Sequence, residues 1–225
     1  MTKQFFYRIL TSIFLFFAVY LMFIDNIFLI LFLSIIFIIS YYEFYKLIIL
    51  IKMNLKLIYF NFIFYNILFS LYLSFFTIII YNSIVHESND KIFILFILSI
   101  CILTDVGGIF FGKLIGGKKL TKISPNKTIS GSIGSFIFSI LPIFLIDLQN
   151  YIDINFYFSL KNILFCLIIS LTCQLGDLFI SYFKRLNKVK NTGSILPGHG
   201  GLLDRIDGII FAIPTASILK LSQIF

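Results

Sequence analysis

The residues in this sequence that could do chemistry are a few aspartates close to basic and glycine-rich stretches. Asp177 lies in LTCQLGDLFISYFKR, and Asp204 and Asp207 lie in PGHGGLLDRIDG. Asp105 follows the apolar stretch LFILSICILT. An ionisable group within or beside a membrane-type apolar run is costly, so Asp105 and Asp177 are candidate functional groups by this argument. A structural ion pair with Lys or Arg is the alternative interpretation.

The spacing of polar residues around Asp177 predicts a polar stripe along one helical face, because residues three or four positions apart are neighbours on a helix. The stripe consists of Gln174, Asp177, Ser181 and Lys184. Asp204 and Asp207 share a face in the same way, at the start of the last apolar run. A helix N-terminus there favours negative charge, and simple capping is the alternative, although capping needs only one acid.

These acids predict a divalent metal site. If the last two apolar runs form antiparallel helices, Asp177 and Asp204 lie at their inner ends and can meet. Neighbouring carboxylates repel each other unless a cation lies between them, and oxygen ligands without partner His or Cys suit Mg²⁺. We expect Asp177 and Asp204 as metal ligands, with Asp105 and Asp207 as further candidates. The candidate catalytic residues are Asp177, Lys184, Asp204 and Asp207.

Two basic, glycine-rich loops predict phosphate binding: GKLIGGKKLTKISPNKTISG at 112–131 and KRLNKVKNTGSILPGHGGLLD at 184–204. Lys and Arg bind phosphate, and glycine lets backbone N–H groups approach an anion. The candidate binding residues are Ser124, Lys127, Thr128, Lys184, Arg185, His199, Gly200, Gly201 and Arg205. Ser124 and Thr128 could instead shape the turn, and Arg205 could instead orient the acids. For His199, a structural hydrogen bond is an alternative to phosphate contact or proton donation.

The elements that must position these residues are apolar enough to span a membrane. The chain has 225 residues, of which 60% are hydrophobic and 12% charged, whereas about a quarter are charged in a soluble domain. Long apolar runs predict an all-α, polytopic membrane bundle with about seven spans and a range of six to nine. The predicted spans are residues 9–24, 27–42, 58–84, 92–111, 132–148, 161–182 and 206–224. The first two are short, and Asn61 and Asn66 could split the third.

Charge predicts the orientation of the chain. With the N-terminus inside, 15 of the 18 Lys and Arg residues fall in inner segments, as the positive-inside rule requires. We therefore expect a multi-pass protein of the inner membrane whose active site faces the cytoplasm. This orientation also explains the net charge of +8, so nucleic-acid binding is not expected.

Motifs are confined to the later part of the chain. Residues 1–90 contain none and are expected to form transmembrane scaffold. Residues 91–225 contain both basic loops and all the candidate acids named above, so this part is expected to be the catalytic region.

Residues 181–207, SYFKRLNKVKNTGSILPGHGGLLDRID, resemble the signature of the phosphatidate cytidylyltransferase (CDP-diacylglycerol synthase) family. That signature contains Ser-x-x-Lys-Arg, then Lys-Asp, then Pro-x-His-Gly-Gly-x-x-Asp-Arg-x-Asp. The stretches QLGDLFISYFKR, ISPNKTISG and TDVGGIFFGKLIGGKKL are similar to further family motifs, so the resemblance covers roughly residues 95–215. Three departures each remove an acid that is usual in the family. They are Ser130, Ile180 and Asn191, and they put peripheral contacts in doubt.

The resemblance implies transfer of CMP from CTP to phosphatidate, giving CDP-diacylglycerol and pyrophosphate for phospholipid synthesis. It also implies Mg²⁺ dependence, contact with membrane lipids and a homodimer. Three alternatives stay open: another membrane transferase, a cation transporter or channel that uses Asp105 and Asp177, and a non-catalytic lipid-binding paralogue.

Overall fold

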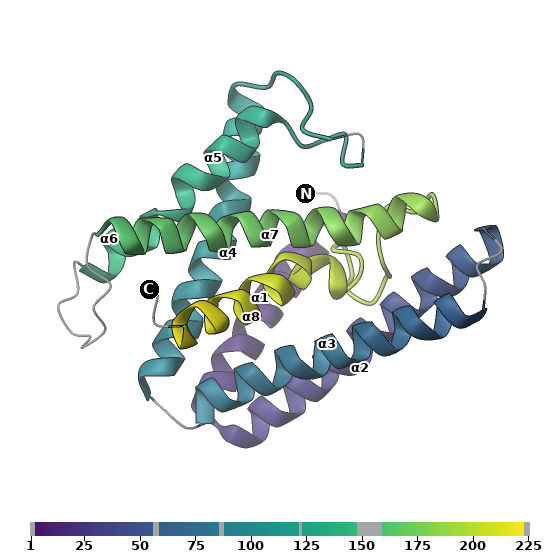
Figure 1. Cartoon of the computed structure of the whole chain (residues 1–225), viewed down its shortest axis with the longest axis horizontal. Coiled ribbons are helices and arrows are strands. Elements are labelled where there is room, and N and C mark those ends of the chain that lie inside the picture. Colours follow the sequence, from purple (N-terminus) through teal and green to yellow (C-terminus); the bar gives the residue numbers. More distant parts are fainter. Residues whose placement is uncertain (1–2, 56–58, 86–87, 122, 148–158, 223–225) are drawn as a thin grey trace. The chain divides into compact units, whose positions relative to one another are not determined.

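The computed structural model describes residues 3–55, 59–85, 88–121, 123–147 and 159–222, whose order along the chain is shown in Figure 1. Across these ranges the regular structure is eight helices, with only two isolated β-bridges besides. The predicted all-α class is therefore confirmed. The predicted span ends at residues 58, 148 and 223–224 lie outside the described residues, as does Lys122 of the first basic loop.

Five described helices are long and apolar enough to cross a membrane, which confirms a polytopic helical membrane protein. The shortest has 22 residues and the longest 30, and 22 residues of helix reach about 33 Å, enough for a hydrocarbon core of about 30 Å. These helices are α1 (Lys3–Ile24), α2 (Asn26–Leu55), α3 (Tyr59–Val85), α4 (Ser88–Leu114) and α7 (Leu160–Leu186).

Two details of the early spans differ from the prediction. The second span is not short, because α2 continues past residue 42 through Glu43, whose side chain is buried and hydrogen-bonded rather than released to solvent. The third is not split at its asparagines. The Asn66 amide donates to the carbonyl of Phe62 within the same helix, so α3 carries this polar side chain without a break.

The fifth predicted span is two helices, α5 (Ile129–Ser139) and α6 (Leu141–Asp147). Pro142 lies in the first turn of α6, where its missing N–H is tolerated, whereas inside a continuous helix it would break the hydrogen-bond ladder. The apolar stretch Ile129–Phe144 reaches only about 24 Å as a helix. The last predicted span is α8 (Leu203–Leu221), whose start contains three charged residues.

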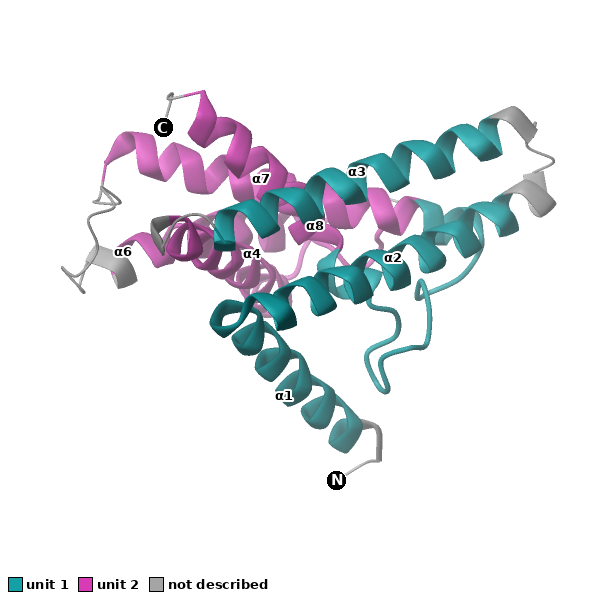
Figure 2. Cartoon of the chain, turned by 90° about the horizontal axis from the view of Figure 1, so that it is seen from below, with its two compact units in different colours: residues 1–85, 183–206 teal, residues 86–182, 207–225 magenta. Residues whose placement is uncertain are grey.

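The chain forms two compact units, which Figure 2 shows in different colours. Unit 1 is Met1–Val85 with Phe183–Ile206, and unit 2 is His86–Tyr182 with Asp207–Phe225. This division differs from the one expected at residue 90, because the second basic loop groups with the N-terminal helices. Helices α7 and α8 each contribute residues to both units.

Unit 1 is built on helix pairs: α1 packs on α2, and α2 packs on α3. Figure 1 shows α2 and α3 running side by side. Phe44 of α2 stacks on Phe69 of α3, and Phe183 meets Phe44 edge-on with 5.4 Å between ring centroids. Just beyond α7, the Asn187 amide donates to the carbonyl of Leu47 at 2.9 Å. The second basic loop is thus joined to α2 from its first residues.

In unit 2, α4 packs closely against α5. A Cβ atom on Gly131 would lie 2.8 Å from the carbonyl oxygen of Gly108, so small residues permit this approach, as is common between membrane helices. Hydroxyl groups add cross-links: Ser135 donates to the carbonyl of Thr104 at 2.7 Å, and Thr104 donates to Ser170 at 3.0 Å. Helices α4, α5 and α7 are therefore fastened inside unit 2 by both packing and hydrogen bonds.

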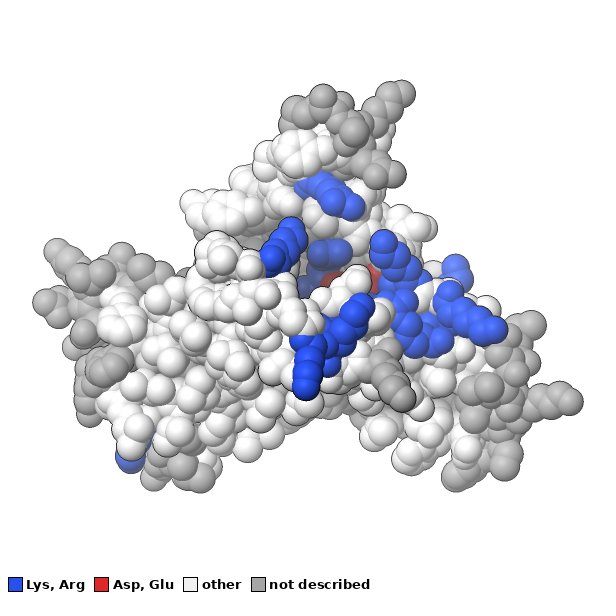
Figure 3. Space-filling view, turned by 90° about the horizontal axis from the view of Figure 1, so that it is seen from above, with Lys and Arg blue, Asp and Glu red and all other residues white. Residues whose placement is uncertain are grey.

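The surface suits a lipid environment. Most of the face drawn in Figure 3 is uncharged, and Lys and Arg occupy a limited part of it. Large apolar side chains such as Phe6, Phe14 and Phe16 of α1 are exposed. Apolar exposure on this scale is unusual for a monomeric soluble protein and indicates contact with a membrane.

Candidate active site

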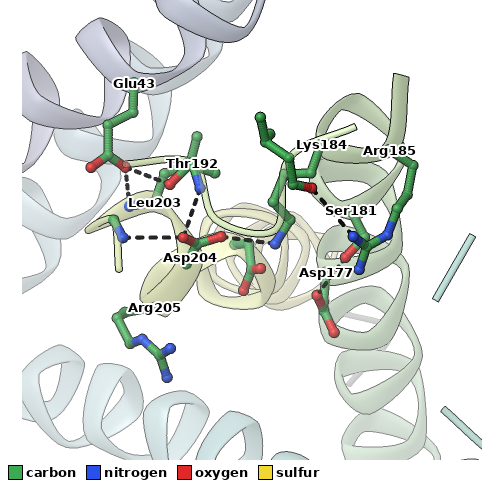
Figure 4. A network of polar contacts seen from close by, with 12 residues as sticks. Glu43, Asp177, Ser181, Lys184, Arg185, Thr192, Leu203, Asp204 and Arg205 are labelled. Atoms are coloured by element: carbon green, nitrogen blue, oxygen red, sulfur yellow. Dashed lines mark hydrogen bonds and ion pairs between the residues drawn. The ribbon is translucent and has the colours of Figure 1, made fainter. Parts of the chain in front are cut away.

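Asp204, in the first turn of α8, is the centre of a hydrogen-bonded network in unit 1 (Figure 4). Its Oδ1 accepts from the Lys184 ammonium at 2.8 Å, and its Oδ2 accepts from the backbone N–H groups of Thr192 at 2.8 Å and Gly201 at 3.1 Å. The side chains of Lys184 and Asp204 are only 9% and 6% exposed. The ion pair is therefore buried, and both ends of the second basic loop are tied to one carboxylate.

Glu43 of α2 is a second buried acid in the same network, with 1% of its surface exposed. Its Oε2 accepts from the Thr192 hydroxyl at 2.7 Å and from the N–H of Leu203 at 2.9 Å. Its Oε1 accepts from the N–H of Leu202 at 3.1 Å. Glu43 thus satisfies N–H groups at the start of α8 that have no partner within the helix.

The sequence interpretation missed Glu43. It ended the second span at residue 42, one position before this acid, and assigned Glu43 no role. The available signal was a lone carboxylate in the apolar stretch YYEFY, which is a functional-site candidate by the same reasoning that selected Asp177. The expectation that residues 1–90 are scaffold left no role for it, whereas α2 supplies this contact to the second basic loop, residues 184–204, called the glycine-rich loop below.

Helix α1 also holds the glycine-rich loop. Gly198 and Gly200, on either side of His199, adopt positive φ angles of 77° and 89°, a conformation that favours glycine. The Nε of Arg8 donates to the carbonyl of Gly198 at 3.0 Å, and Nη2 of Arg205 donates to the carbonyl of His199 at 2.9 Å. Arg205 therefore fixes the backbone of the loop in this structure.

The His199 side chain lies beside α1, where its Nδ1 contacts the Thr11 hydroxyl. The pKa of His199 is lowered, first by loss of hydration and then by the positive charges of Arg205 and Arg8. The imidazole is accordingly neutral at pH 7, because its pKa without these effects is about 6.5. This environment matches the structural alternative for His199 that the sequence left open.

Arg185 lies at the exposed end of α7, where its Nη1 donates to the carbonyl of Val189 at 3.2 Å. Lys188, with a φ of 56°, and a hydrogen bond from the Val189 N–H to the Lys184 carbonyl close the helix end. One departure from the family signature falls in the loop that follows: Asn191 packs against Gly200.

In unit 2, Asp177 forms an ion pair with Lys127 of the first basic loop. Both side chains are half-buried, at 27% and 29% exposed. The Ser181 hydroxyl donates to Asp177 at 3.3 Å, and Gln174 accepts a hydrogen bond from Ser132 of α5 at 2.6 Å. Three of the four residues of the predicted polar stripe therefore make polar contacts within unit 2.

Asp105 and Asp207 also belong to unit 2, and both interact electrostatically with Cys173 of α7. Helices α7 and α8 approach closely here, since a Cβ atom on Gly176 would lie 2.6 Å from the carbonyl oxygen of Asp207. Ile180, a second departure from the signature, is fully buried. An apolar side chain thus fills a position where the family usually has an acid.

The first basic loop contains the remaining candidates. Thr128 caps α5, with its side chain accepting from the N–H of Gly131 at 3.1 Å. Its hydroxyl also pairs with that of Ser130, the third departure, and Ser130 donates to the carbonyl of Gly116. Ser124 accepts at its carbonyl from the N–H of Lys127 at 3.1 Å. These contacts match the alternative in which Ser124 and Thr128 shape the turn.

The predicted site residues are divided between the units. Unit 1 contains Lys184, Arg185, His199, Gly200, Gly201, Asp204 and Arg205, whereas unit 2 contains Asp105, Ser124, Lys127, Thr128, Asp177 and Asp207. The meeting of Asp177 with Asp204 stays a prediction. No group of three or more His, Cys, Asp and Glu side chains is arranged to hold a metal ion among the described residues. Mg²⁺ is commonly held by one or two carboxylates together with substrate phosphates, so a preformed protein cage is not required.

Three proteins with similar sequences carry the same enzyme name. The chain is 44% identical over 139 residues to a phosphatidate cytidylyltransferase of Staphylococcus haemolyticus (strain JCSC1435), covering 61% of this chain and 52% of that protein. It is 46% identical over 127 residues to one of Rickettsia bellii (strain RML369-C), covering 53% and 54%. A third, from Staphylococcus aureus (strain COL), is 46% identical over 139 residues, covering 61% and 52%. The matches thus span about half the length of these curated relatives.

A sequence model of the Cytidylyltransferase family matches residues 2–222. The match includes the N-terminal helices as well as the region of the motifs, so it extends the resemblance found in residues 95–215. Nearly the whole chain is covered, and the chain therefore belongs to the cytidylyltransferase family.

Proposed function

We propose that this protein transfers the CMP group of CTP to phosphatidate, forming CDP-diacylglycerol and pyrophosphate. The observation that carries the proposal is the buried Asp204–Lys184 pair, fixed by backbone N–H groups of the glycine-rich loop. It places a cationic group at the end of α7 directly beside an anionic group at the start of α8. The family membership and the names of the similar proteins support the same reaction.

The chemistry needs little acid–base help from the protein. An oxygen of the phosphatidate phosphate attacks the α-phosphorus of CTP and forms a new P–O bond. The bond between the α-phosphorus and its bridging oxygen breaks, and pyrophosphate leaves with the electron pair. A phosphate monoester is already anionic at pH 7, because its second pKa is about 6. The main barrier is therefore repulsion between anions, which positioning and charge neutralisation can lower.

The proposed roles follow from the contacts of each side chain. Lys184 and Lys127 carry charges that pair with carboxylates in the structure and would bind phosphate when substrate is present. Arg185 is exposed at the end of α7 and is a further phosphate ligand. Arg205 and His199 are occupied with the loop itself, so we assign them a positioning role.

The carboxylates suit Mg²⁺, which would supply positive charge to the triphosphate when bound. Asp204 uses three acceptor positions for nitrogen donors, whereas a carboxylate offers about four. Asp177 holds the ammonium of Lys127. A site that already attracts an ammonium group also attracts a hard cation. We therefore propose Asp177 and Asp204 as ligands, with Asp105 and Asp207 as further candidates.

We propose that the site faces the cytoplasm from the inner membrane. The distribution of Lys and Arg supports this orientation, and CTP is available on that side. Phosphatidate would enter laterally with its phosphate at the membrane surface. The homodimer rests on the resemblance alone.

The test is incorporation of label into lipid. Purified protein in vesicles containing phosphatidate receives CTP labelled at the α-phosphorus, with and without Mg²⁺. We expect a labelled lipid only when phosphatidate and Mg²⁺ are both present, and release of pyrophosphate in equal amount. Phosphatidate binding without incorporation would support the non-catalytic paralogue. Cation flux through the vesicles without incorporation would support a channel that uses Asp105 and Asp177.

A further inference from the structure

Glu43 has no part in the reaction as proposed so far, yet it is among the most deeply buried charged side chains described. It lies on α2, and the residues it contacts are about 150 positions further along the chain. We propose that Glu43 is a positioning residue that fixes Asp204 for the reaction. This inference rests on the proposed function, because it assigns Asp204 to that reaction.

The contacts of Glu43 are directed at the beginning of α8. Both of its oxygens accept backbone N–H groups of consecutive residues, Leu202 and Leu203. These N–H groups lie at a helix N-terminus, where the helix dipole favours a negative charge. Glu43 is thus a helix cap supplied by a different helix, and it sets where α8 starts relative to α2.

Glu43 and Asp204 bind alternating groups of the same two loop segments (Figure 4). Thr192 donates its hydroxyl to Glu43 and its backbone N–H to Asp204. The N–H of Gly201 goes to Asp204, and the next two N–H groups go to Glu43. A shift of the loop away from Glu43 therefore changes the donors around Asp204 directly.

The loop is shaped to admit this carboxylate. A Cβ atom on Gly193 would overlap the Glu43 carboxylate, and one on Gly201 would overlap both Glu43 and the Thr192 hydroxyl. Glycine at both positions leaves room for the acid between the two segments. Because both loop segments fit closely around the carboxylate, its position is better explained as a specific binding position for Glu43 than as a chance contact.

The decisive variant is Glu43→Gln, which keeps the size of the side chain. Glutamine offers one acceptor oxygen and one NH₂ donor, so at least one N–H at the start of α8 faces another donor and loses its partner. We expect kcat/KM for CTP to fall by about tenfold or more. The loss of one buried hydrogen-bond partner commonly has an effect of this size. We also expect a higher Mg²⁺ concentration at half-maximal rate.

Three further variants complete the set. Thr192→Val removes only the hydroxyl link, and Thr192→Ser keeps it, so serine should recover most of the activity that valine loses. Asp25→Asn is the matched control, because Asp25 also accepts a backbone N–H at the start of a helix. It precedes α2 and lies about 27 Å along the helix axis from Glu43, so it should leave both readouts unchanged.

Hydrogen exchange provides a readout that is independent of activity. In the full-length protein purified in detergent, at least one of the Leu202 and Leu203 amides should exchange at least about tenfold faster in Glu43→Gln than in wild type, because glutamine keeps only one of the two acceptor oxygens. The same amides should be unaffected in Asp25→Asn.

Each outcome bears on the proposal. Faster exchange together with a raised Mg²⁺ requirement supports it. Lower thermal stability with unchanged kinetics per folded molecule would reduce Glu43 to a structural residue and overturn it, as would unchanged exchange. If wild type shows no transferase activity, the proposed function fails, and exchange at Leu202 and Leu203 then reports only the contact. If Glu43→Gln does not fold, the Thr192→Val and Thr192→Ser pair decides through the same kinetic readouts, and equal kinetics in the two would overturn the proposal.

Discussion

Replacing Asp204 by asparagine should have separable effects on stability and on activity. In the structure Asp204 neutralises Lys184 with both side chains less than 10% exposed. Asp204→Asn therefore leaves a buried ammonium without its counter-charge, and such a loss costs about 3–5 kcal/mol. For a protein of 150–250 residues each kcal/mol shifts Tm by about 2–4 °C. We thus expect Tm to fall by about 6 °C or more.

The double variant Asp204→Asn with Lys184→Met removes both charges. Because neither charge of the pair is then left without its partner, we expect it to recover at least half of the lost stability. Activity should not recover, because neither the carboxylate nor the ammonium is restored. We expect transferase rates at least about 100-fold below wild type in both variants. Between the single and the double variant, stability should therefore recover while activity stays low.

The measurements are thermal unfolding of the purified proteins in one detergent and incorporation of labelled CMP into lipid. The control is Asp90→Asn, which breaks the more exposed ion pair of Asp90 with Lys220. An exposed pair is worth about 0–1 kcal/mol, so Tm should change little. Near-normal rates in Asp204→Asn would refute the assignment of Asp204 to the reaction. An unchanged Tm in that variant would refute the buried pair, and recovery of activity in the double variant would show that only folding was at stake.

Two further predictions concern the glycine-rich loop. The pKa of His199 is lowered in the folded protein by burial and by Arg205 and Arg8, so its contribution to stability is complete above the unfolded value of about 6.5 and is lost as pH falls through the folded value. Tm measured from pH 8 to pH 5 should therefore decline less in His199→Gln than in wild type, and identical profiles would contradict this environment. Gly201→Ala should abolish activity and lower Tm, because the new Cβ overlaps Glu43 and Thr192. A variant with wild-type rate and Tm would show that the two loop segments are not packed as described.

Sequence patterns predicted the class of fold and the approximate position of most helices. Long apolar runs have few alternatives to membrane helices, and the predicted spans 58–84 and 161–182 lie close to α3 and α7. The break near Pro142 was missed because the apolar composition continues across it. The length of α2 was also missed: the predicted span ends at residue 42, whereas the helix continues through the buried Glu43 to Leu55.

The site was predictable only where its residues are close in sequence. The contact of Ser181 with Asp177 follows directly from helical spacing. Lys184 and Asp204 were both predicted for the site, but as a phosphate ligand and a metal ligand rather than as an ion pair. The contact of Glu43 with Thr192 joins residues 149 positions apart. No local periodicity encodes such a contact, so it depends on the tertiary packing of α2.

Burying charged groups in this network costs free energy, and this cost indicates that the network has a function beyond stability. Residues 187–202 connect α7 and α8, and a connection of this length without helix or strand is uncommon unless it has a role in binding or catalysis. Its ends are fastened by three buried charged groups, Glu43, Lys184 and Asp204. Apolar side chains of similar size would commonly give equal or greater stability. What they could not provide is a carboxylate whose position is fixed by two backbone N–H groups and one ammonium. The arrangement is therefore better explained by the need to present Asp204 and Lys184 together than by the stability of the fold.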